Sequence, residues 1–302
     1  MTVGTPLVSV VIPTKNSASN IEKCLKLVLQ QTYKNIEIIV VDSGTDRTAD
    51  IAKEYGCKVI TVNTHMTGAR NRGTENASGE FLFHLDNDIQ LIDRATVAKC
   101  VDLCKSSADA VFVPQVFKGR NFWGKCREIE FMVYLNYSPL IVARFIKRKV
   151  LEYLGGYDEG LLSGEDWDIT LKLRRGGFVV ATAESLMIHG WGNVDLLHNM
   201  RKSYNYGKTV ESYARKYPRE TIVQWGPSRF KYLFRKGVEL APKYVMGILL
   251  LKSLEFGAGF AGVVSSRVRR SVKAGPGNRP DGVQHRQNQA NQLCRRAIFL
   301  SQ

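Results

Sequence analysis

Short apolar runs alternate with amphipathic segments along the first half of the chain. The run 8–12 is followed by apolar residues at positions 21, 24, 25, 28 and 29, which share one face of a helix. Further apolar runs at 36–41, 58–62 and 81–85 are again separated by helical patterns. Apolar strands that alternate with helices predict a parallel sheet buried on both faces. The expected fold class is therefore α/β, with a Rossmann-like, mostly parallel sheet between helices.

The alternation continues more loosely as far as residue 189. Helical patterns follow at 93–106, 121–137 and 147–154, and a further helix ends at Gly176-Gly177. Apolar runs predict four more short strands at 110–113, 141–146, 178–182 and 185–189. Residues 194–217 have the pattern of one helix that mixes aromatic and basic residues. We therefore expect a first domain over residues 1–192 and a helical region over 193–266.

Residues 244–264 are nearly apolar, and Lys252 and Glu255 are their only charges. A helix of this length can span a bilayer, but each charge at its centre costs about 2.5–3.5 kcal/mol on the insertion scale. On a helical wheel these charges share one stripe, opposite the apolar residues, with Tyr244, Ile248, Gly259 and Gly262. We therefore predict an interfacial helix or a short hairpin rather than a full span. A helix in a soluble core or a dimer interface is the alternative.

The formal net charge of +15 is concentrated near the C-terminus. Residues 1–200 are neutral, whereas 201–243 contain 11 basic and 3 acidic residues, and 267–302 contain 8 basic and 1 acidic residue. A basic region binds nucleic acid or an anionic membrane surface, or is simply solvated. No nucleic-acid-binding motif accompanies it, so we expect a membrane partner and no nucleic acid. The tail 267–302 is also rich in Gly, Asn and Gln, and we expect it to be disordered.

Two further features concern the compartment. The six cysteines form no Cys-x-x-Cys pair, which favours a reducing environment. The chain does not begin with a basic segment followed by a long apolar run, which argues against a signal peptide. We therefore expect a cytoplasmic protein that lies peripherally on the inner face of the cell membrane.

Asp86-Asn87-Asp88 stands directly after the apolar run 81–85. Residues i and i+2 of an extended segment point to the same side, so two carboxylates emerge together where a buried strand meets solvent. At about 5 Å they would repel by roughly 3 kcal/mol at an effective dielectric of about 20, and a divalent cation reverses the sign of that interaction. Such oxygen ligands suit Mg²⁺ or Mn²⁺, and Gln90 on the same face adds an amide oxygen. A polar turn without a metal is the alternative.

Polar residues also stand at other expected strand ends. Pro13-Thr14 ends the first strand and Asp42 ends the second. Ligands of open α/β sheets bind at the carboxyl ends of the strands, where these residues and the acidic pair converge. The sequence therefore predicts a nucleotide site at this edge.

Four segments of the chain occur in a characteristic order and spacing: 11–16, 40–46, 86–88 and 164–166. In this order they resemble the family 2 glycosyltransferases, which have the A-type (GT-A) nucleotide-diphosphosugar transferase fold. The segments 68–73 and 154–159 are also similar to that family. The resemblance covers roughly residues 7–190.

The resemblance implies roles for matching residues on the donor side. Pro13, Thr14 and Asn16 stand in the segment that lines the nucleotide base and ribose. Asp42 matches the acid that holds the base, and Arg70 matches a basic residue near the phosphates. Asp86, Asn87 and Asp88 match the motif that contacts the ribose and the metal ion, so Mg²⁺ or Mn²⁺ is the implied cofactor.

The resemblance also implies a catalytic base. Asp166 matches that base, with Glu165 beside it, although acids at this position also stabilise the N-terminus of a helix. His189 matches a late histidine that reaches the metal or the diphosphate in some sugar-nucleotide enzymes. A satisfied structural histidine is the alternative there.

The implied function is a metal-dependent, inverting glycosyltransferase of the hexosyltransferase type. It would move a sugar from a nucleotide-diphosphosugar donor to a hydroxyl of a lipid-linked or membrane-associated glycan. The Gln-x-x-Arg-Trp motif of processive synthases is missing, which favours a single transfer. The loop after Val41 is one residue shorter than usual, so both uridine and guanosine stay open. The rival interpretations are a nucleotidyltransferase with the same metal site and a catalytically inactive, membrane-docked binding module.

Overall fold

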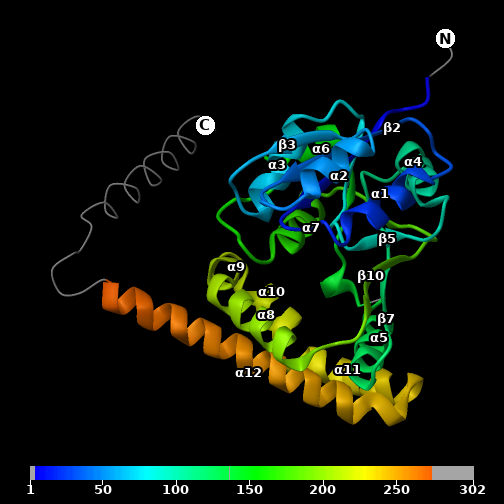
Figure 1. The fold of residues 1–302 in the computed structure, drawn as a ribbon. Helices are drawn as coiled ribbons and strands as arrows, with labels where there is room; N and C mark the ends of the chain where they lie inside the picture. Colours follow the sequence, from blue (N-terminus) through cyan, green and yellow to red (C-terminus); the bar gives the residue numbers. More distant parts are fainter. Residues whose placement is uncertain (1–3, 136, 274–302) are drawn as a thin grey trace, which may run out of the picture.

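The computed structural model describes residues 4–135 and 137–273, which form an α/β domain and an adjoining layer of helices (Figure 1). The order of the main sheet is β3-β2-β1-β4-β8-β6-β9. Its strands are β1 (Val8–Thr14), β2 (Ile36–Asp42), β3 (Lys58–Thr61), β4 (Phe81–His84), β6 (Ala110–Phe112), β8 (Phe145–Lys147) and β9 (Val180–Thr182). Only β8 runs antiparallel to its neighbours β4 and β6. The prediction of a mostly parallel sheet is confirmed.

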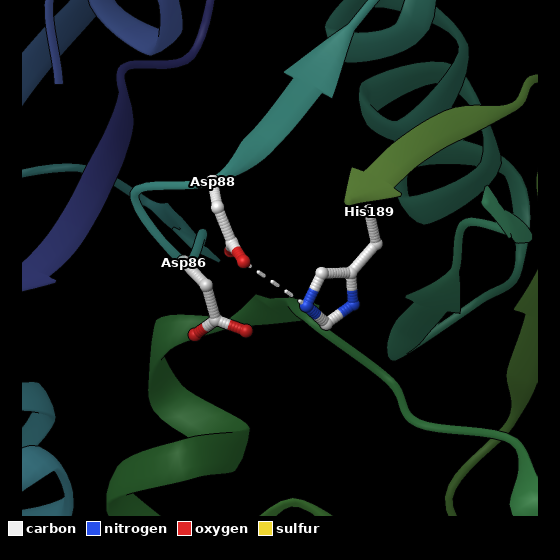
Figure 2. A group of neighbouring side chains, drawn as sticks. All are labelled: Asp86, Asp88 and His189. Atoms are coloured by element: carbon white, nitrogen blue, oxygen red, sulfur yellow. Dashed lines mark ion pairs between the residues drawn. The ribbon is translucent and has the colours of Figure 1, made fainter. Parts of the chain in front are cut away.

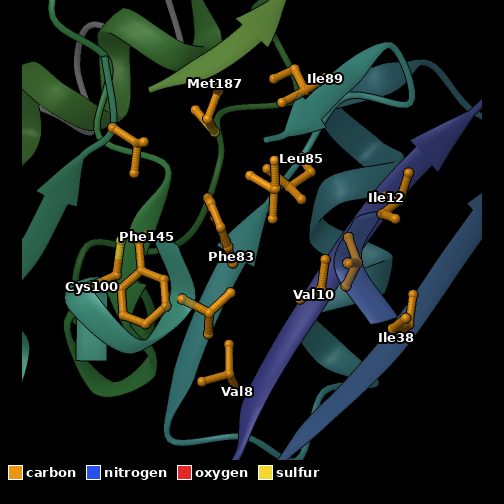
Figure 3. Packing of buried hydrophobic residues seen from close by; sticks show 14 of the residues in the cluster. Val8, Val10, Ile12, Ile38, Phe83, Leu85, Ile89, Cys100, Phe145 and Met187 are labelled. Carbon is orange, nitrogen blue, oxygen red and sulfur yellow. The ribbon is translucent and has the colours of Figure 1, made fainter. Parts of the chain in front are cut away.

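Alternate residues of the central strands pack against opposite faces of this sheet. Ile38 and Val40 of β2 join a core with α1, α2 and α4, whereas Ile39 and Val41 join one with α3, α6 and α7. Figure 3 shows the first of these cores, in which Phe83 and Phe145 meet the apolar side chains of β1. These helices are α1 (Ile21–Leu29), α2 (Thr48–Glu54), α3 (Met66–Glu75), α4 (Thr96–Ser106), α6 (Arg148–Tyr153) and α7 (Glu165–Arg175). Burial on both faces explains the unbroken apolar runs.

A second sheet, which the sequence patterns did not predict as such, has the order β5-β10-β7. It consists of β5 (Ile89–Leu91), β7 (Gln115–Gly119) and β10 (Met187–Gly192). The predicted strand 185–189 contributes to β10, but β5 and β7 were missed. Both are short, and each pairs only with a strand about 70 to 100 residues later in the chain. Their partner β10 carries His189 opposite Ile89.

The remaining helices form a layer below the α/β domain (Figure 1). They are α5 (Phe122–Tyr134), α8 (Leu196–Thr209), α9 (Glu211–Lys216), α10 (Pro218–Trp225), α11 (Pro227–Leu240) and α12 (Pro242–Lys273), and a 3₁₀ turn, η1 (Ser138–Leu140), follows α5. The predicted helix 194–217 is thus two helices that divide at Val210. Helix α5 lies within the predicted first domain, yet its Cys126 and Val133 pack with Leu233 of α11 and Ile248 of α12.

Helix α12 corrects two expectations about the C-terminus. It is one continuous helix, so the hairpin alternative for 244–264 is wrong. It also extends to Lys273, so residues 267–273 are helical and the boundary predicted at 266 falls inside an element. The rest of the predicted tail, 274–302, lies outside the described residues. The predicted stripe of α12 faces the rest of the protein: Lys252 pairs with Glu130 of α5 at 2.7 Å.

Candidate active site

The predicted nucleotide-side residues meet where β1, β2 and β4 end. Thr14 and Asp42 are register partners in the parallel β1–β2 pair, and the Thr14 hydroxyl donates to Asp42 Oδ1 at 2.7 Å. Asn87 Nδ2 donates to the Pro13 carbonyl oxygen at 3.4 Å, which ties the segment after β4 to β1. Both Asp42 and Thr14 are buried. The edge therefore presents a fixed carboxylate with a hydroxyl beside it.

Asn16 fastens the loop after β1 to the loop after β2. Its backbone is left-handed, with φ of 52°, a region that asparagine tolerates better than most residues. Its Oδ1 accepts a hydrogen bond from the Thr45 backbone N–H at 2.9 Å. A Cβ on Gly44 would come within 2.8 Å of that Oδ1, so the close approach of the two loops requires glycine there.

Asp86, Asp88 and His189 form the group that can hold a metal ion. Figure 2 shows their side chains converging, the two acids from the segment after β4 and the histidine from β10. One ligand atom of each lies within 4.8 Å of the others, and Asp88 Oδ2 is 3.6 Å from His189 Nε2. The structure therefore brings together three residues that lie up to 103 positions apart in the chain.

The histidine is oriented by a residue that the sequence analysis missed. His189 Nδ1 lies 2.9 Å from Gln115 Oε1 on the neighbouring strand β7. A proton on Nδ1 that is donated to this oxygen leaves Nε2 with its lone pair toward Asp88. Two carboxylates and a neutral imidazole fit Mn²⁺ well and Mg²⁺ adequately. Only knowledge of the β7–β10 pairing could have identified Gln115.

Gln90, the fourth predicted metal ligand, lies on β5 next to this group. The register pairs Gln90 with Ile188, one position away from the pair of Ile89 with His189. Successive side chains of a strand point to opposite faces, so Gln90 and His189 lie on opposite faces of the β5–β10 ribbon. Gln90 as a ligand stays a prediction, and the ribbon geometry does not favour it.

Arg70 is buried at the centre of the acidic residues. Its guanidinium contacts Asp86 Oδ1 at 2.7 Å, Glu165 Oε1 at 2.6 Å and Asp166 Oδ1 at 2.9 Å. Only 1% of its side chain is exposed, and it also lies 5.5 Å from the centre of the Tyr157 ring. The predicted catalytic pair of α7 and the predicted metal motif are therefore joined through one side chain of α3.

A second arginine, Arg144, completes the cluster and was not predicted. Its Nη2 contacts Asp86 Oδ2 and Asp166 Oδ2, each at 2.9 Å. It stands just before β8, within the apolar run 141–146. A charged residue inside a buried run is rare unless it is paired, and this was the available signal. Asp86 and Asp166 are thus each held through both oxygens by two guanidinium groups.

We call the buried group of Arg70, Arg144, Asp86 and Asp166 the clamp. Burial and mutual charge shift the pKa values in and around it. Burial alone would raise the pKa of Asp86, but the charges of Arg144 and Arg70 outweigh it and hold that pKa well below its usual range. Burial and then the charge of Asp166 raise the pKa of Glu165 above its ordinary value. Beneath the clamp, burial and then Arg70 and Arg144 lower the pKa of His84 to about 3, so this histidine is neutral.

Helix α7 presents Glu165 and Asp166 of its first turn to the arginines. The residue before it, Gly164, is left-handed with φ of 83°, and a Cβ there would lie 2.6 Å from the Tyr213 ring. Tyr213 belongs to α9, so the helical layer presses directly against the start of α7. Helix α8 adds Tyr206, which is 48% exposed and whose pKa is raised by burial and then by Glu165 and Asp86. Tyr206 is therefore the residue of α8 that lies within electrostatic reach of Glu165 and Asp86.

Comparisons with known proteins agree with this geometry. Residues 9–157 match the family model for glycosyl transferase family 2. Glycosyltransferase AglE of Haloferax volcanii is 28% identical over 205 residues, which cover 62% of this chain and 67% of that protein. A PGL/p-HBAD biosynthesis glycosyltransferase of Mycobacterium tuberculosis is 28% identical over 178 residues, which cover 55% of this chain and 69% of that protein.

Two solved structures share the fold. The mannosyltransferase PcManGT from Pyrobaculum calidifontis, in complex with GDP-Man and Mn²⁺, has a TM-score of 0.54 at 20% identity and covers 96% of this chain and 81% of its own. Staphylococcus aureus TarS 1–349, in complex with UDP-GlcNAc, has a TM-score of 0.52 at 15% identity and covers 87% and 92%. The predicted GT-A fold is confirmed.

Proposed function

Because the chain belongs to glycosyl transferase family 2, we propose that it transfers a hexose from a nucleotide-diphosphosugar to an acceptor hydroxyl with inversion. The observation that carries the proposal is the clamp in which Arg70 and Arg144 hold Asp166 beside Asp86. The clamp fixes the carboxylate of Asp166 next to the metal-binding group. General base catalysis and stabilisation of a departing diphosphate require such neighbours.

The donor would lie along the carboxyl ends of β1, β2 and β4. Asp42, oriented by Thr14, would accept hydrogen bonds from the nucleotide base, and Asp86 would face the ribose. Asp88 and His189, with Asp86 beside them, would hold Mg²⁺ or Mn²⁺. The ion, when bound, supplies positive charge to the diphosphate oxygens.

Asp166 would act on the acceptor. Its carboxylate takes the proton of the acceptor hydroxyl as that oxygen attacks the anomeric carbon from the face opposite the diphosphate. The bond from the anomeric carbon to the diphosphate oxygen breaks in the same step, so the configuration inverts. Arg70 and Arg144 each contact one oxygen of Asp166 and so hold its carboxylate in position before this transfer. A positioned base typically contributes about 10²–10⁴-fold to the rate.

The acceptor would be a lipid-linked or membrane-associated glycan on the inner face of the cell membrane. The motive is the charge distribution, since residues 201–243 contain 11 basic and 3 acidic residues next to the long apolar helix α12. Tyr213 of α9 supports an acceptor side near this layer, because it packs on Gly164, the residue before Glu165 and Asp166.

The test combines a donor screen with an Asp166 variant. A thermal-shift screen of nucleotide sugars with Mn²⁺ identifies the donor, and turnover is then measured with that donor. Asp166→Asn should retain donor binding within about twofold and lose about 10²–10⁴-fold in turnover. Asp102→Asn, an exposed acid of α4, is the matched control and should behave like the wild type.

Two results would contradict the proposal. Asp166→Asn with unchanged turnover would remove the base assignment. Release of diphosphate from a nucleoside triphosphate, with no turnover of any nucleotide sugar, would favour a nucleotidyltransferase, in which Glu165 and Asp166 have no evident role.

A further inference from the structure

One side of α12 is an exposed apolar surface. Its exposed apolar residues recur four positions apart with a single gap of six, and on a helical wheel they share one face with Phe256 at its margin. This apolar face consists of Met246, Leu250, Phe256, Phe260, Val264 and Val268, with exposures of 73%, 52%, 51%, 65%, 44% and 56%. Exposed apolar side chains gathered in this way indicate an interaction site rather than ordinary surface.

The charges of the middle of α12 point the other way, into the protein. Lys252 Nζ contacts Glu130 and Glu255, each at 2.7 Å, and Glu255 also pairs with Arg127 of α5. The small residues of the inner side fit against α8, since a Cβ on Gly262 would overlap the Tyr204 carbonyl. The apolar face therefore has no charged residue between Met246 and Val264.

Basic residues stand at both ends of the apolar face. Lys243 is exposed at its start, and Arg267 and Arg269 are exposed at its end. An apolar stripe between cations matches a bilayer interface with anionic headgroups. A second copy of this chain matches it less well, because each copy carries a net charge of +15 and the two would repel.

The attachment of α12 decides how it can meet a bilayer. Residues 242–269 are long and apolar enough to cross one, and most of this apolar stretch is not buried inside the protein. However, the inner side is bound to α5 through Glu130 and Arg127 and to α8 through the Tyr204–Ser265 hydrogen bond. A crossing would carry these groups into hydrocarbon, which is costly. Only the outward face is free to enter lipid.

We propose that the apolar face of α12 lies in the plane of an anionic membrane and docks the whole enzyme there without crossing the bilayer. Helix α8, which packs on α12 through Gly207 and Gly259, then lies between the lipid and the α/β domain (Figure 1). The docking itself is independent of the chemistry, but a membrane-borne acceptor as its purpose rests on the proposed function.

Vesicle co-sedimentation of the full chain tests the docking surface. Vesicles of phosphatidylcholine with phosphatidylglycerol should bind the wild type at least tenfold more tightly than phosphatidylcholine alone. The triple variant Met246→Ser/Leu250→Ser/Phe260→Ser should lose at least tenfold of this binding. Tyr153→Ser/Ile222→Ser, which removes apolar residues of 79% and 67% exposure outside α12, should change it less than twofold.

Depth measurements separate docking from crossing. The Phe260→Trp variant should show a blue shift of its added fluorescence on anionic vesicles and strongest quenching by lipids brominated near the headgroup. Strongest quenching at the bilayer centre would overturn in-plane docking. Unchanged vesicle binding of the triple variant would overturn the docking surface. A wild-type protein that is a dimer, and a triple variant that is a monomer, would instead assign the apolar face to a contact between two copies of the chain.

Donor turnover separates this proposal from the proposed function. The triple variant should keep wild-type hydrolysis of a soluble sugar nucleotide, because none of its three residues contacts Asp86, Glu165 or Asp166. Loss of vesicle binding with intact hydrolysis supports the surface. Intact vesicle binding with no turnover of any nucleotide sugar contradicts only the chemistry.

Discussion

At the scale of single residues, the site depends on two buried arginines that distribute charge among three carboxylates. Arg70 and Arg144 each contact Asp86 and Asp166, and Arg70 also contacts Glu165. A buried cluster of this kind does little for net stability, but removal of one partner leaves an uncompensated charge. The arrangement fixes the positions of the acids before any ligand arrives.

The contribution of Arg144 is measurable in the pH dependence of turnover. Loss of its charge in Arg144→Gln should raise the pKa of Asp86 from its depressed value, since Arg144 is the strongest charge that lowers it. Asp86 then protonates at a higher pH, so the acid limb of kcat/KM should move upward. Turnover at neutral pH should fall roughly tenfold or more, as expected for a positioning residue.

Two variants control this prediction. Arg144→Lys keeps the charge and should restore part of the acid limb, while Lys149→Gln on the exposed side of α6 should match the wild type. An acid limb that stays in place in Arg144→Gln, with lower turnover only, would assign Arg144 a purely structural role.

The metal site is testable without any turnover assay. Saturating Mn²⁺ at about 100 times its dissociation constant should stabilise the wild type by about 2.7 kcal/mol, which corresponds to a rise of several degrees in Tm. Asp88→Asn and His189→Ala should each lose most of this rise, because each removes one ligand of the three. An undiminished rise in both variants would place the ion elsewhere; Asp102→Asn is the control.

At the scale of elements, α5 and α12 are joined by ion pairs across their contact. Glu130 is 3% exposed and contacts Lys252 and Arg127, each at 2.7 Å. Burial would raise the pKa of Glu130, but Lys252 and Arg127 outweigh it and lower that pKa to about 2. Lys252 and Glu255, which the sequence predicts on one stripe of the helix, thus fix the position of α12 and of its apolar face.

The pH dependence of stability reports on this interface. A depressed carboxyl pKa stabilises the folded state above the unfolded pKa of about 4.5, and this stabilisation is lost as the pH falls toward 2. Glu130→Gln should therefore cost about 3–5 kcal/mol at pH 7 and distinctly less at pH 3 in urea unfolding. Glu239→Gln, whose carboxylate is half-exposed, should leave the stability nearly unchanged at either pH. A cost of Glu130→Gln that does not depend on pH would refute the charge argument.

At the scale of the whole molecule, the helical layer helps to position the proposed catalytic acids. Tyr213 of α9 packs on Gly164, which immediately precedes Glu165 and Asp166. The same layer carries the proposed membrane surface on α12. The proposed docking surface and the proposed catalytic acids are therefore joined by direct packing through α8 and α9.

A pair of glycine variants isolates this contact. Gly164→Ala and Gly155→Ala both place a side chain at a left-handed backbone, with φ of 83° and 76°. Each should cost about 1–2 kcal/mol of stability for that reason. Only the first meets a neighbour, the Tyr213 ring, so Gly164→Ala should cost about 1–3 kcal/mol more and should lower turnover. Equal stability and turnover in the two variants would show that Tyr213 does not constrain the acids.

The local patterns of the chain were sufficient for the main sheet and most of its helices. The apolar runs that became β1, β2 and β4 are mostly buried, so their composition specified them, and β3 at the edge of the sheet is only half-buried. The ends of these strands placed Thr14, Asp42 and Asp86 at one edge. By contrast, β5 and β7 are three and five residues long and depend on pairing with β10, which no local pattern encodes.

The sequence by itself determined the fold class, the acidic motif at a strand end and the acids that begin α7. Each of these depends on periodicity or on the chemistry of adjacent residues. Tertiary structure alone decided that Arg144 joins Arg70 between Asp86 and Asp166, that Gln115 orients His189, and that Lys252 and Glu255 of α12 face inward. These contacts join residues that are distant in the chain, and their energies depend on burial, which exists only once the elements have packed.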